Sequence, residues 1–440
     1  MLKDNKVQVS IIGAGFSGLS AAYELVKQGI NVCVIESESE VGGLAAAFDV
    51  EGEKLDRFYH HWFTNDEAVM NLIKEFNLMD KVEISPTNTG IYYANNFFKL
   101  STPFDLLKFK PLSLIDRFRL GLLALKARRV KDWELLEKMT AKEWLINMGG
   151  LNVYKVIWEP LLKGKFGPYA ESVSAVWFWN KLKLRGGSRG KGGEERLAYF
   201  KGGFIALAKF ISKKMQSSGG ELLLNTKVLN ARRNDGKWII NTNKGYIYSD
   251  RVIFTTSLPI IANIIDNFAK KDFLKSLRRI HYIGNICLVL ELNESLSDTY
   301  WLNVNDPSFP FVGVIEHTNF ESPKTYGGRH IVYLSKYLPH TDKIYSMNAD
   351  QFLEYALPFL KKMFPHFKKS LIFRYHLWKA RWSQPVVEKN YSSLIPMSDS
   401  PIEGMHICSM AQIYPEDRGT NYAIREGRKI GKRIAKMFRE

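Results

Sequence analysis

The first forty residues alternate short apolar runs with a glycine-rich segment, a pattern typical of two parallel strands joined by a helix. Residues 9–12 are apolar apart from one serine, which predicts a strand buried on both faces. Apolar residues then recur at helical spacing over residues 19–25, and Gly29 follows where the helix should end. Residues 32–35 form a second apolar run. We therefore expect a strand, a helix and a parallel second strand at the start of the chain.

The turn between the first strand and the helix carries Gly13, Gly15 and Gly18 in the spacing G-x-G-x-x-G. The first glycine allows a tight turn, the second lets the backbone approach a pyrophosphate, and the third lets the helix pack closely on the sheet. The start of the helix would offer free N–H groups to the phosphates. Glu36 follows the second strand, where its carboxylate can accept hydrogen bonds from an adenosine ribose and disfavours a 2′-phosphate. These residues predict a dinucleotide site that does not take NADP.

Glu36 is followed, five residues later, by the pair Gly42 and Gly43. This arrangement resembles the extended fingerprint of the glutathione-reductase-type flavoproteins, in the branch of the amine oxidases, phytoene desaturases and protoporphyrinogen oxidases. The family often has an arginine after the pair, and this chain has Leu44, so that contact is not carried over. The resemblance implies FAD as the cofactor. The positions that it implies as cofactor contacts are Gly13, Gly15, Phe16, Ser17, Gly18, Glu36, Gly42, Gly43, Leu44, Val228, Gly419, Thr420 and Asn421.

Later segments fit the same family, whose cofactor domain is assembled from separated stretches of chain. Residues 199–211 resemble the return into that domain, and residues 406–430 resemble its last strand and helix. In the family, the start of that helix faces the pyrimidine end of the flavin. The resemblance implies an α/β fold, with a Rossmann-type FAD-binding domain interleaved with an α+β substrate domain. The FAD-binding domain would comprise residues 1–90, 201–257 and 396–440, and the substrate domain residues 91–200 and 258–395.

The composition narrows the function classes. The 440 residues include 62 Lys and Arg against 45 Asp and Glu, a net charge of +17, which indicates an acidic partner or simply a solvated basic surface. Three distant cysteines without a CxxC pair predict no metal site and fit a reducing compartment. No apolar run is long enough to span a bilayer, and no signal peptide is expected, so we expect a cytoplasmic protein. Basic charge without a recognised module predicts no nucleic-acid partner. The oligomeric state stays open.

Two basic segments interrupt the predicted substrate domain. Residues 101–132 interleave eight basic residues and three acidic ones with Leu and Phe, which favours peripheral membrane contact or, alternatively, an ordinary helix with a solvated face. Residues 180–201 combine seven basic residues with a glycine cluster, which predicts a flexible loop. That loop could close over an anionic substrate or carry incidental charge. The aromatic residues 177–179 just before it are expected in the core or a pocket wall.

Four residues are candidate catalytic groups. Adjacent His60 and His61 lie in a stretch resembling one that follows the glycine pair in the family, and a similar stretch of UDP-galactopyranose mutase, so they could carry a proton or be structural. Residues 378–385 resemble the family's last substrate strand, which runs past the flavin ring. Arg381 and Gln384 on that strand are therefore candidates. Cys408 falls within a predicted strand, so we expect FAD to be bound non-covalently.

Three functions remain open. The first is an FAD-dependent oxidoreductase that removes two electrons, as a hydride to flavin N5, from a hydrophobic lipid-, isoprenoid- or porphyrin-like substrate. The second is a non-redox flavoenzyme resembling UDP-galactopyranose mutase and acting on a nucleotide sugar. The third is a non-catalytic binding protein resembling the GDP-dissociation inhibitors, which share the fold. The substrate is expected to be a small molecule or a lipid in either enzyme.

Overall fold

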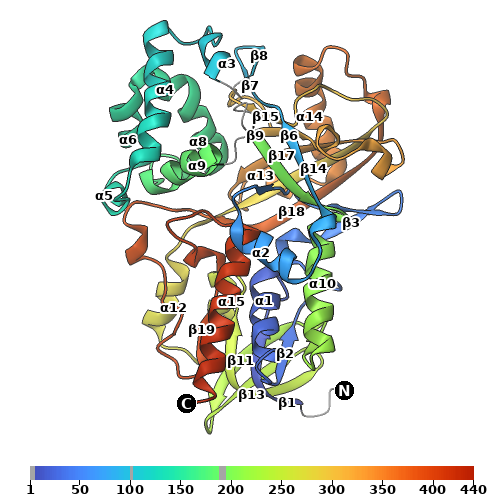
Figure 1. Cartoon of the computed structure of the whole chain (residues 1–440), viewed down its shortest axis with the longest axis vertical. Coiled ribbons are helices and arrows are strands. Elements are labelled where there is room, and N and C mark those ends of the chain that lie inside the picture. Colours follow the sequence, from blue (N-terminus) through green and yellow to red (C-terminus); the bar gives the residue numbers. More distant parts are fainter. Residues whose placement is uncertain (1–4, 100–102, 188–194) are drawn as a thin grey trace.

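The two predicted strands and the helix between them form the centre of one body of the structure (Figure 1). The computed structural model describes residues 5–99, 103–187 and 195–440. Strand β1 (Asn5–Ile12), helix α1 (Phe16–Val26) and strand β2 (Val32–Ile35) follow each other as the sequence predicts, and β1 and β2 pair in parallel. Apolar clusters pack against both faces of these strands, which accounts for their uninterrupted hydrophobic character.

The first sheet is assembled from three separated stretches of chain. Its strands run in the order β10-β2-β1-β13-β12-β11, and β19 pairs with β13 on the far side. The pairs β10–β2, β2–β1, β1–β13 and β13–β19 are parallel, while β11 and β12 form an antiparallel extension. This topology confirms the predicted Rossmann-type α/β architecture. The additional strands are β10 (Glu221–Leu223), β11 (Val228–Asn234), β12 (Lys237–Thr242), β13 (Gly245–Phe254) and β19 (Met405–Ile407).

Helix α15 (Thr420–Met437), close to the carboxyl terminus, lies directly against α1 (Figure 1). The contact depends on Gly427 and Gly431, one turn apart on α15. A Cβ at Gly431 would lie 2.6 Å from the carbonyl oxygen of Ala21, and one at Gly427 would collide with the carbonyl of Ser17. The two glycines therefore set the distance between the helices. Helix α10 (Gly203–Ser217) packs on the other flank of α1.

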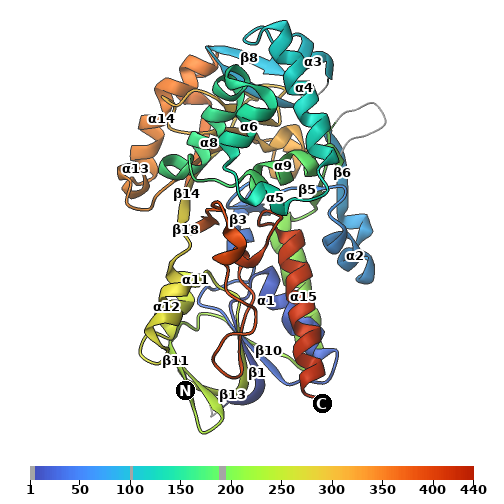
Figure 2. The same cartoon turned by 90° about the vertical axis from the view of Figure 1, so that its left-hand side faces the viewer.

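The second sheet lies above the first and is mixed. Its order is β18-β14-β17-β16-β15-β7-β8, in which only the pair β15–β7 is parallel. Strand β14, next to the edge strand β18, is buried along its whole length, and β18 reaches down toward the first sheet (Figure 2). The strands are β7 (Thr89–Tyr93), β8 (Asn96–Lys99), β14 (Tyr282–Leu292), β15 (Trp301–Val304), β16 (Gly313–Glu316), β17 (His330–Leu338) and β18 (Ile372–Pro385).

Helices flank the second sheet on two sides, as an α+β substrate domain requires (Figure 2). One cluster comprises α3 to α9, and the other comprises α13 and α14. Within residues 5–99, 103–187 and 195–440, no helix is both long and apolar enough to cross a bilayer. The helices are α3 (Pro103–Leu107), α4 (Leu114–Arg129), α5 (Glu134–Glu137), α6 (Ala141–Gly149), α7 (Leu151–Val153), α8 (Glu159–Phe166), α9 (Ala175–Gly187), α13 (Lys343–Ser346) and α14 (Ala349–Met363).

Short elements connect the two bodies. Strands β3 and β4 form a hairpin, and β9 pairs with both β5 and β6 in a three-stranded sheet. The residue boundaries of the two domains remain predictions. The strands of these elements are β3 (Ala47–Val50), β4 (Glu53–Asp56), β5 (Trp62–Phe63), β6 (Val82–Thr87) and β9 (Glu195–Phe200), and the remaining helices are α2 (Glu67–Glu75), α11 (Leu258–Ile264) and α12 (Lys271–Arg278).

The prediction of a flexible loop over residues 180–201 is wrong for most of that segment. Helix α9 continues to Gly187, and strand β9 begins at Glu195, while residues 188–194 lie outside the described part of the chain. The basic residues at the start of the segment are thus carried on a helix. That helix forms because its aromatic side chains Trp177, Phe178 and Trp179 are buried against the core.

Candidate functional site

The glycines of the first turn form an open cradle at the carboxyl end of β1. Gly13 has φ of +108°, and a Cβ there would lie 2.7 Å from the Thr255 hydroxyl oxygen. A Cβ at Gly18 would collide with the carbonyl of Gly13, so α1 can approach the turn only without one. Gly15 behaves differently, because no heavy atom lies within 4 Å of a Cβ built on it. The turn is therefore closed toward the sheet and open outward.

The glycine pair lines the opposite side of this cradle. Gly42 and Gly43 have φ of +116° and +59°, and Gly42 donates its N–H to the carbonyl of Ala14 at 2.9 Å. Glu36 lies beside them and accepts the N–H of Ala14 at 2.8 Å. These bonds fix the carboxylate at the mouth of the turn, where it keeps lone pairs for a ribose hydroxyl.

The cradle fits a dinucleotide in its donor groups as well as in its shape. The cap residue of α1 is Gly15, whose lack of a side chain leaves the first N–H groups of the helix without a side-chain cap. Phe16 is buried under the turn, Ser17 and Leu44 are half-buried at its edges, and Val228 begins β11 beyond Glu36. The residues present could therefore hold the phosphates and adenosine of FAD.

A second feature, a pocket of about 390 Å³, lies between the two bodies. Gly419, Thr420 and Asn421, at the start of α15, form one end of it, so the positive end of that helix dipole faces the pocket. The Thr420 hydroxyl accepts the Trp62 indole N–H at 2.6 Å, which ties α15 to β5. We call it the aromatic pocket after the nine aromatic side chains in its wall, Tyr59, Trp62, Phe63, Trp158, Trp177, Phe178, Trp301, Tyr337 and Tyr422.

The end of the pocket near α15 is polar and is organised around Asp417. This buried carboxylate pairs with Lys181 of α9 at 2.6 Å and accepts the Gln384 amide N–H at 2.9 Å. Arg418 donates to the Gln384 amide oxygen at 3.0 Å and to the Tyr337 hydroxyl at 3.4 Å. Burial alone would raise the pKa of Asp417, but the neighbouring cations hold it well below its usual range. Asp417 is therefore ionised.

Lys165 of α8 enters the same end of the pocket. Its Nζ lies 4.7 Å from the centre of the Trp177 ring and 5.3 Å from that of Tyr337. The nearest carboxylate oxygen, on Asp417, is 3.8 Å away and beyond hydrogen-bond distance. Burial among rings, together with the charges of Lys181 and Arg418, lowers the pKa of Lys165 to about 7 despite Asp417.

Both predicted histidines line the pocket, but they differ in environment. His60 stacks on Phe204 at 5.1 Å, and burial lowers its pKa to about 3, so it is neutral at physiological pH. His61 Nδ1 lies 3.1 Å from the Tyr300 hydroxyl and its ring packs edge-on against Trp301. His60 is thus a poor proton acceptor, whereas His61 has a polar partner.

Of the two candidates on β18, the structure brings only one to the pocket. Gln384 is fully buried and bridges Asp417 to Arg418. Arg381 is exposed, with its Nη2 3.1 Å from Nε2 of His340 and its guanidinium over Trp382, so its placement does not support a role in the pocket. The register of β18 shifts between these two positions, and the sequence gives no sign of that shift. Sequence reasoning also missed the pocket side chains of Lys165, Lys181, Asp417 and Arg418.

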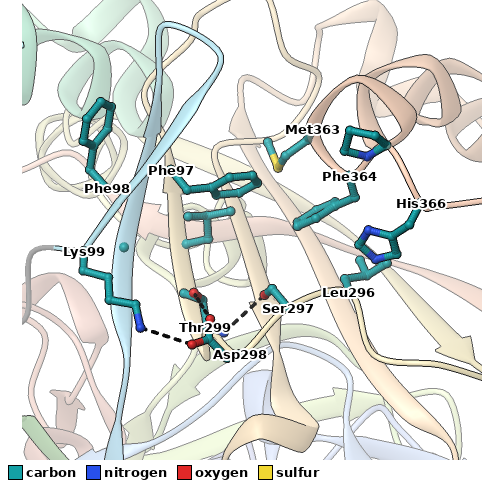
Figure 3. Close-up of a pocket in the computed structure, with 13 residues that line it drawn as sticks. Phe97, Phe98, Lys99, Leu296, Ser297, Asp298, Thr299, Met363, Phe364 and His366 are labelled. Atoms are coloured by element: carbon teal, nitrogen blue, oxygen red, sulfur yellow. Dashed lines mark hydrogen bonds and ion pairs between the residues drawn. The ribbon is translucent and has the colours of Figure 1, made fainter.

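A second cavity, of about 340 Å³, opens at the far edge of the second sheet (Figure 3). Phe97 and Phe364 face each other across it with ring centres 5.5 Å apart, and Lys99 pairs with Asp298 at 3.1 Å on its rim. It lies apart from the cradle and the aromatic pocket, and its lining contains no buried charge that points to a reaction.

A Rossmann-type cradle in one body, with an aromatic pocket between the two bodies, defines the class of dinucleotide-binding proteins with a separate substrate domain. A sequence profile of flavin containing amine oxidoreductases matches residues 16–433, so the chain belongs to this family. It is therefore a flavin-dependent oxidoreductase, as its sequence predicts, and the non-catalytic alternative has no support from the match.

Known proteins similar to this chain match it over different shares of its length. A 15-cis-phytoene desaturase of an Oncidium hybrid cultivar is 23% identical over 434 residues, covering 91% of this chain and 73% of that protein. Protoporphyrinogen oxidase 2 of Arabidopsis thaliana is 25% identical over 295 residues, covering 57% of each. The structure of a reduced UDP-galactopyranose mutase matches with a TM-score of 0.76 at 14% identity, over 98% of this chain and 96% of that one. This last likeness is one of fold.

Proposed function

We propose that the protein binds FAD non-covalently in the cradle and oxidises a hydrophobic substrate of isoprenoid or porphyrin type in the aromatic pocket. The observation that carries the proposal is the pocket itself, whose wall of aromatic side chains meets the start of α15. Relatives named for phytoene and protoporphyrinogen support this substrate class. Cys408 is buried directly after β19, which agrees with a cofactor that is not attached through that sulfur.

The side chains of the pocket position the substrate, exclude water and supply charge. Bound FAD would supply the chemistry, accepting two electrons as a hydride at N5 from a substrate C–H bond. The aromatic wall excludes water and favours flat or extended apolar molecules. The N-terminus of α15 would stabilise negative charge at this end of the pocket, as a helix dipole does.

The charge of the pocket argues against a simple protonated amine as substrate. Three cationic side chains line the pocket, Lys165, Lys181 and Arg418, against two carboxylates, Asp66 and Asp417. Burial raises the pKa of Asp66 to about 6, so part of its charge is lost in mildly acidic solution. A cation would enter against this positive excess, whereas a neutral or anionic molecule would not.

The test is an absorption spectrum of the purified protein, repeated on the supernatant after denaturation. We expect flavin bands that follow the soluble fraction, and anaerobic bleaching of those bands by a carotenoid precursor or a porphyrinogen. Flavin that stays with the precipitate would contradict non-covalent binding. Bands that no apolar substrate bleaches would contradict the oxidase function.

The second candidate is a non-redox enzyme acting on a nucleotide sugar. Its support is the fold shared with UDP-galactopyranose mutase, together with the cationic end of the pocket, which would suit a diphosphate. Activity that requires pre-reduced flavin, with tight binding of UDP, would favour this candidate over the oxidase. Activity with oxidised flavin and an apolar substrate would exclude it.

Peripheral contact with a membrane through residues 101–132 is part of the proposal. Asp116, Leu120, Leu123 and Ala127 form the buried face of α4. The opposite face is apolar and exposed, and with α3 it forms the α3–α4 surface, at the end of the molecule far from both termini (Figures 1 and 2). At 100° per residue, Arg117 and Arg128 flank that face on one side and Arg119 and Lys126 on the other. The exposed apolar side chains are Phe104, Leu107, Leu114, Ile115, Phe118, Leu122 and Leu125.

An apolar surface between rows of arginine and lysine matches a bilayer that contains anionic lipids. Phe104, Leu114 and Phe118 are 74%, 71% and 72% exposed, an unusual state for such large side chains on a helix pair. Insertion of this face would remove the apolar area from water, while the flanking cations would remain among the lipid headgroups. A hydrophobic substrate dissolved in the bilayer would then be close to the protein that oxidises it.

A further inference from the structure

We propose that the polar end of the aromatic pocket is an anion-binding subsite, in which Lys165 and Arg418 hold a carboxylate or phosphate of an otherwise apolar substrate. The inference rests on the proposed function, because it takes this pocket as the substrate site, and it adds a charged group to the substrate class. Its basis is that Lys165, Lys181 and Arg418 share a single neighbouring carboxylate, Asp417, which forms its short ion pair with Lys181.

Arg418 is held in place by neutral acceptors. Its Nε donates to the Gln384 amide oxygen at 3.0 Å, and its Nη2 lies 3.4 Å from the Tyr337 hydroxyl. Gln384 is itself fixed by donating to Asp417 at 2.9 Å. The guanidinium is thus oriented by the buried Gln384 and the half-buried Tyr337, and its remaining N–H groups are available for the two oxygens of a carboxylate or phosphate.

Lys165 faces the same space from α8. Its ammonium group lies over the Trp177 ring at 4.7 Å, and the Tyr337 ring that contacts Arg418 is 5.3 Å away. Both cations therefore border Tyr337, which places them within reach of one anionic group. Lys181 is less available to a ligand, because its Nζ already forms a 2.6 Å ion pair with Asp417. Asp417 is therefore in close contact with Lys181, while its nearest oxygen stays 3.8 Å from Lys165, beyond hydrogen-bond distance.

The surroundings of Lys165 couple binding to proton uptake. Asp417 and Arg418 face it from the segment before α15, Lys181 from α9 and Tyr337 from β17. Its pKa is lowered to about 7, so an anion placed against it would raise that pKa and draw a proton onto Nζ. Uptake should be small at about pH 6, where the free amine is already protonated, and should approach about one proton per ligand at about pH 8.

The experiment compares 1-pyrenebutyrate with its uncharged analogue 1-pyrenebutanol on the flavin-loaded protein. We expect the carboxylate to bind at least about tenfold more tightly, by titration calorimetry and by energy transfer from tryptophan. Lys165→Met should remove about tenfold of that preference and all of the proton uptake, measured in buffers of different ionisation enthalpy. The butanol should bind the variant as it binds the native protein, which shows that the pocket is intact.

Lys183→Met is the matched control, because Lys183 lies on the exposed side of α9 outside the pocket lining. It should change neither affinity nor proton uptake. Equal binding of both pyrenes, or native affinity and uptake in Lys165→Met, would overturn the subsite. UDP serves as the phosphate arm, so a preference for UDP over pyrenebutyrate assigns the subsite to a nucleotide diphosphate and the reverse preference to an apolar acid.

Different experimental results would contradict the anion-binding subsite and the proposed oxidase function. A flavoprotein that is bleached by apolar substrates but shows no preference for a carboxylate loses the subsite and keeps the oxidase function. A protein that takes up no FAD yet binds pyrenebutyrate through Lys165 keeps the subsite and loses the oxidase function.

Discussion

At the scale of single residues, Asp56 is the buried carboxyl on which the contact between the two bodies depends. It ends β4, and its two carboxyl oxygens accept the Tyr199 hydroxyl at 3.0 Å and the Phe204 N–H at 3.1 Å. The Tyr333 hydroxyl of the second sheet donates to its carbonyl oxygen at 2.7 Å. Burial raises the pKa of Asp56 to about 7, although both side-chain hydrogen bonds lower it. The folded protein thus holds a proton at Asp56 that the unfolded chain releases near pH 4.

This difference predicts how stability depends on pH. Between about pH 4 and 7 the folded state binds more protons at Asp56 than the unfolded state, so the contribution of Asp56 to the free energy of unfolding should fall as the pH rises. From about pH 5 to 7 this contribution should fall by about 2 kcal/mol, so the difference in free energy of unfolding between the native protein and Asp56→Asn should change by that amount. Urea denaturation at several pH values measures both slopes. Asp49→Asn, at an exposed position of the same hairpin, controls for loss of an acid, and equal slopes in all three proteins would contradict the prediction.

Residue identities in the cradle could be predicted, and those in the pocket could not. The glycines and Glu36 are specified by local spacing, because a phosphate-binding turn needs the same short stretch of chain in every such fold. Lys165 and Lys181 reach the pocket from two different helices, and only tertiary packing places them beside Asp417. Asp417 and Arg418 directly precede the predicted Gly419, so their position next to a flavin-facing helix was the one available signal.

At the scale of elements, α15 depends on its close contact with α1. A valine at position 427 would meet the Ser17 carbonyl and push the helices apart. Gly427→Val should therefore lower the free energy of unfolding by about 2 kcal/mol and weaken FAD retention, since α1 begins in the cradle. Thermal unfolding and flavin release on dilution measure the two effects. Lys429→Ala, an exposed position on the same helix, should leave both unchanged.

Segments with glycine clusters were the hardest elements to predict. Glycine and basic residues after position 180 favour a loop by composition, yet α9 continues to Gly187. The indole of Trp179 donates to the Ala127 carbonyl of α4 at 2.8 Å, and this buried contact anchors the helix where local propensity does not. Strands β1 and β2 were predictable for the opposite reason, because burial on both faces leaves an uninterrupted apolar run.

At the scale of the whole molecule, the α3–α4 surface predicts one orientation on a bilayer. Phe118→Ser, Leu122→Ser and Leu125→Ser together should reduce flotation with anionic liposomes at least about tenfold, because the apolar side chains that would insert are lost. Folding should be unaffected, since all three side chains are exposed. Replacing anionic by zwitterionic lipid should also reduce flotation of the native protein.

The control for flotation is a pair of exposed apolar residues elsewhere, Leu229 and Met397, changed to serine. We expect this pair to float as the native protein does. Flotation of the triple variant at the native level would contradict membrane contact through the α3–α4 surface. Flotation that does not depend on lipid charge would contradict the role of the flanking cations and leave the apolar side chains as the membrane contact.

The contact between α1 and α15 also determines how long α1 stays uncovered while the chain is being synthesised. Arg428 pairs with Glu24 at 2.6 Å across 404 positions of sequence. Ribosomes add about 5 to 20 residues per second, so the partner of α1 emerges roughly 20 to 80 seconds after α1 itself. During that interval the face of α1 that α15 will cover is open to chaperones and to neighbouring nascent chains. Helix α15 can meet α1 only after the 404 positions from Glu24 to Arg428 have been translated, and stable capture of the cofactor must wait for that meeting.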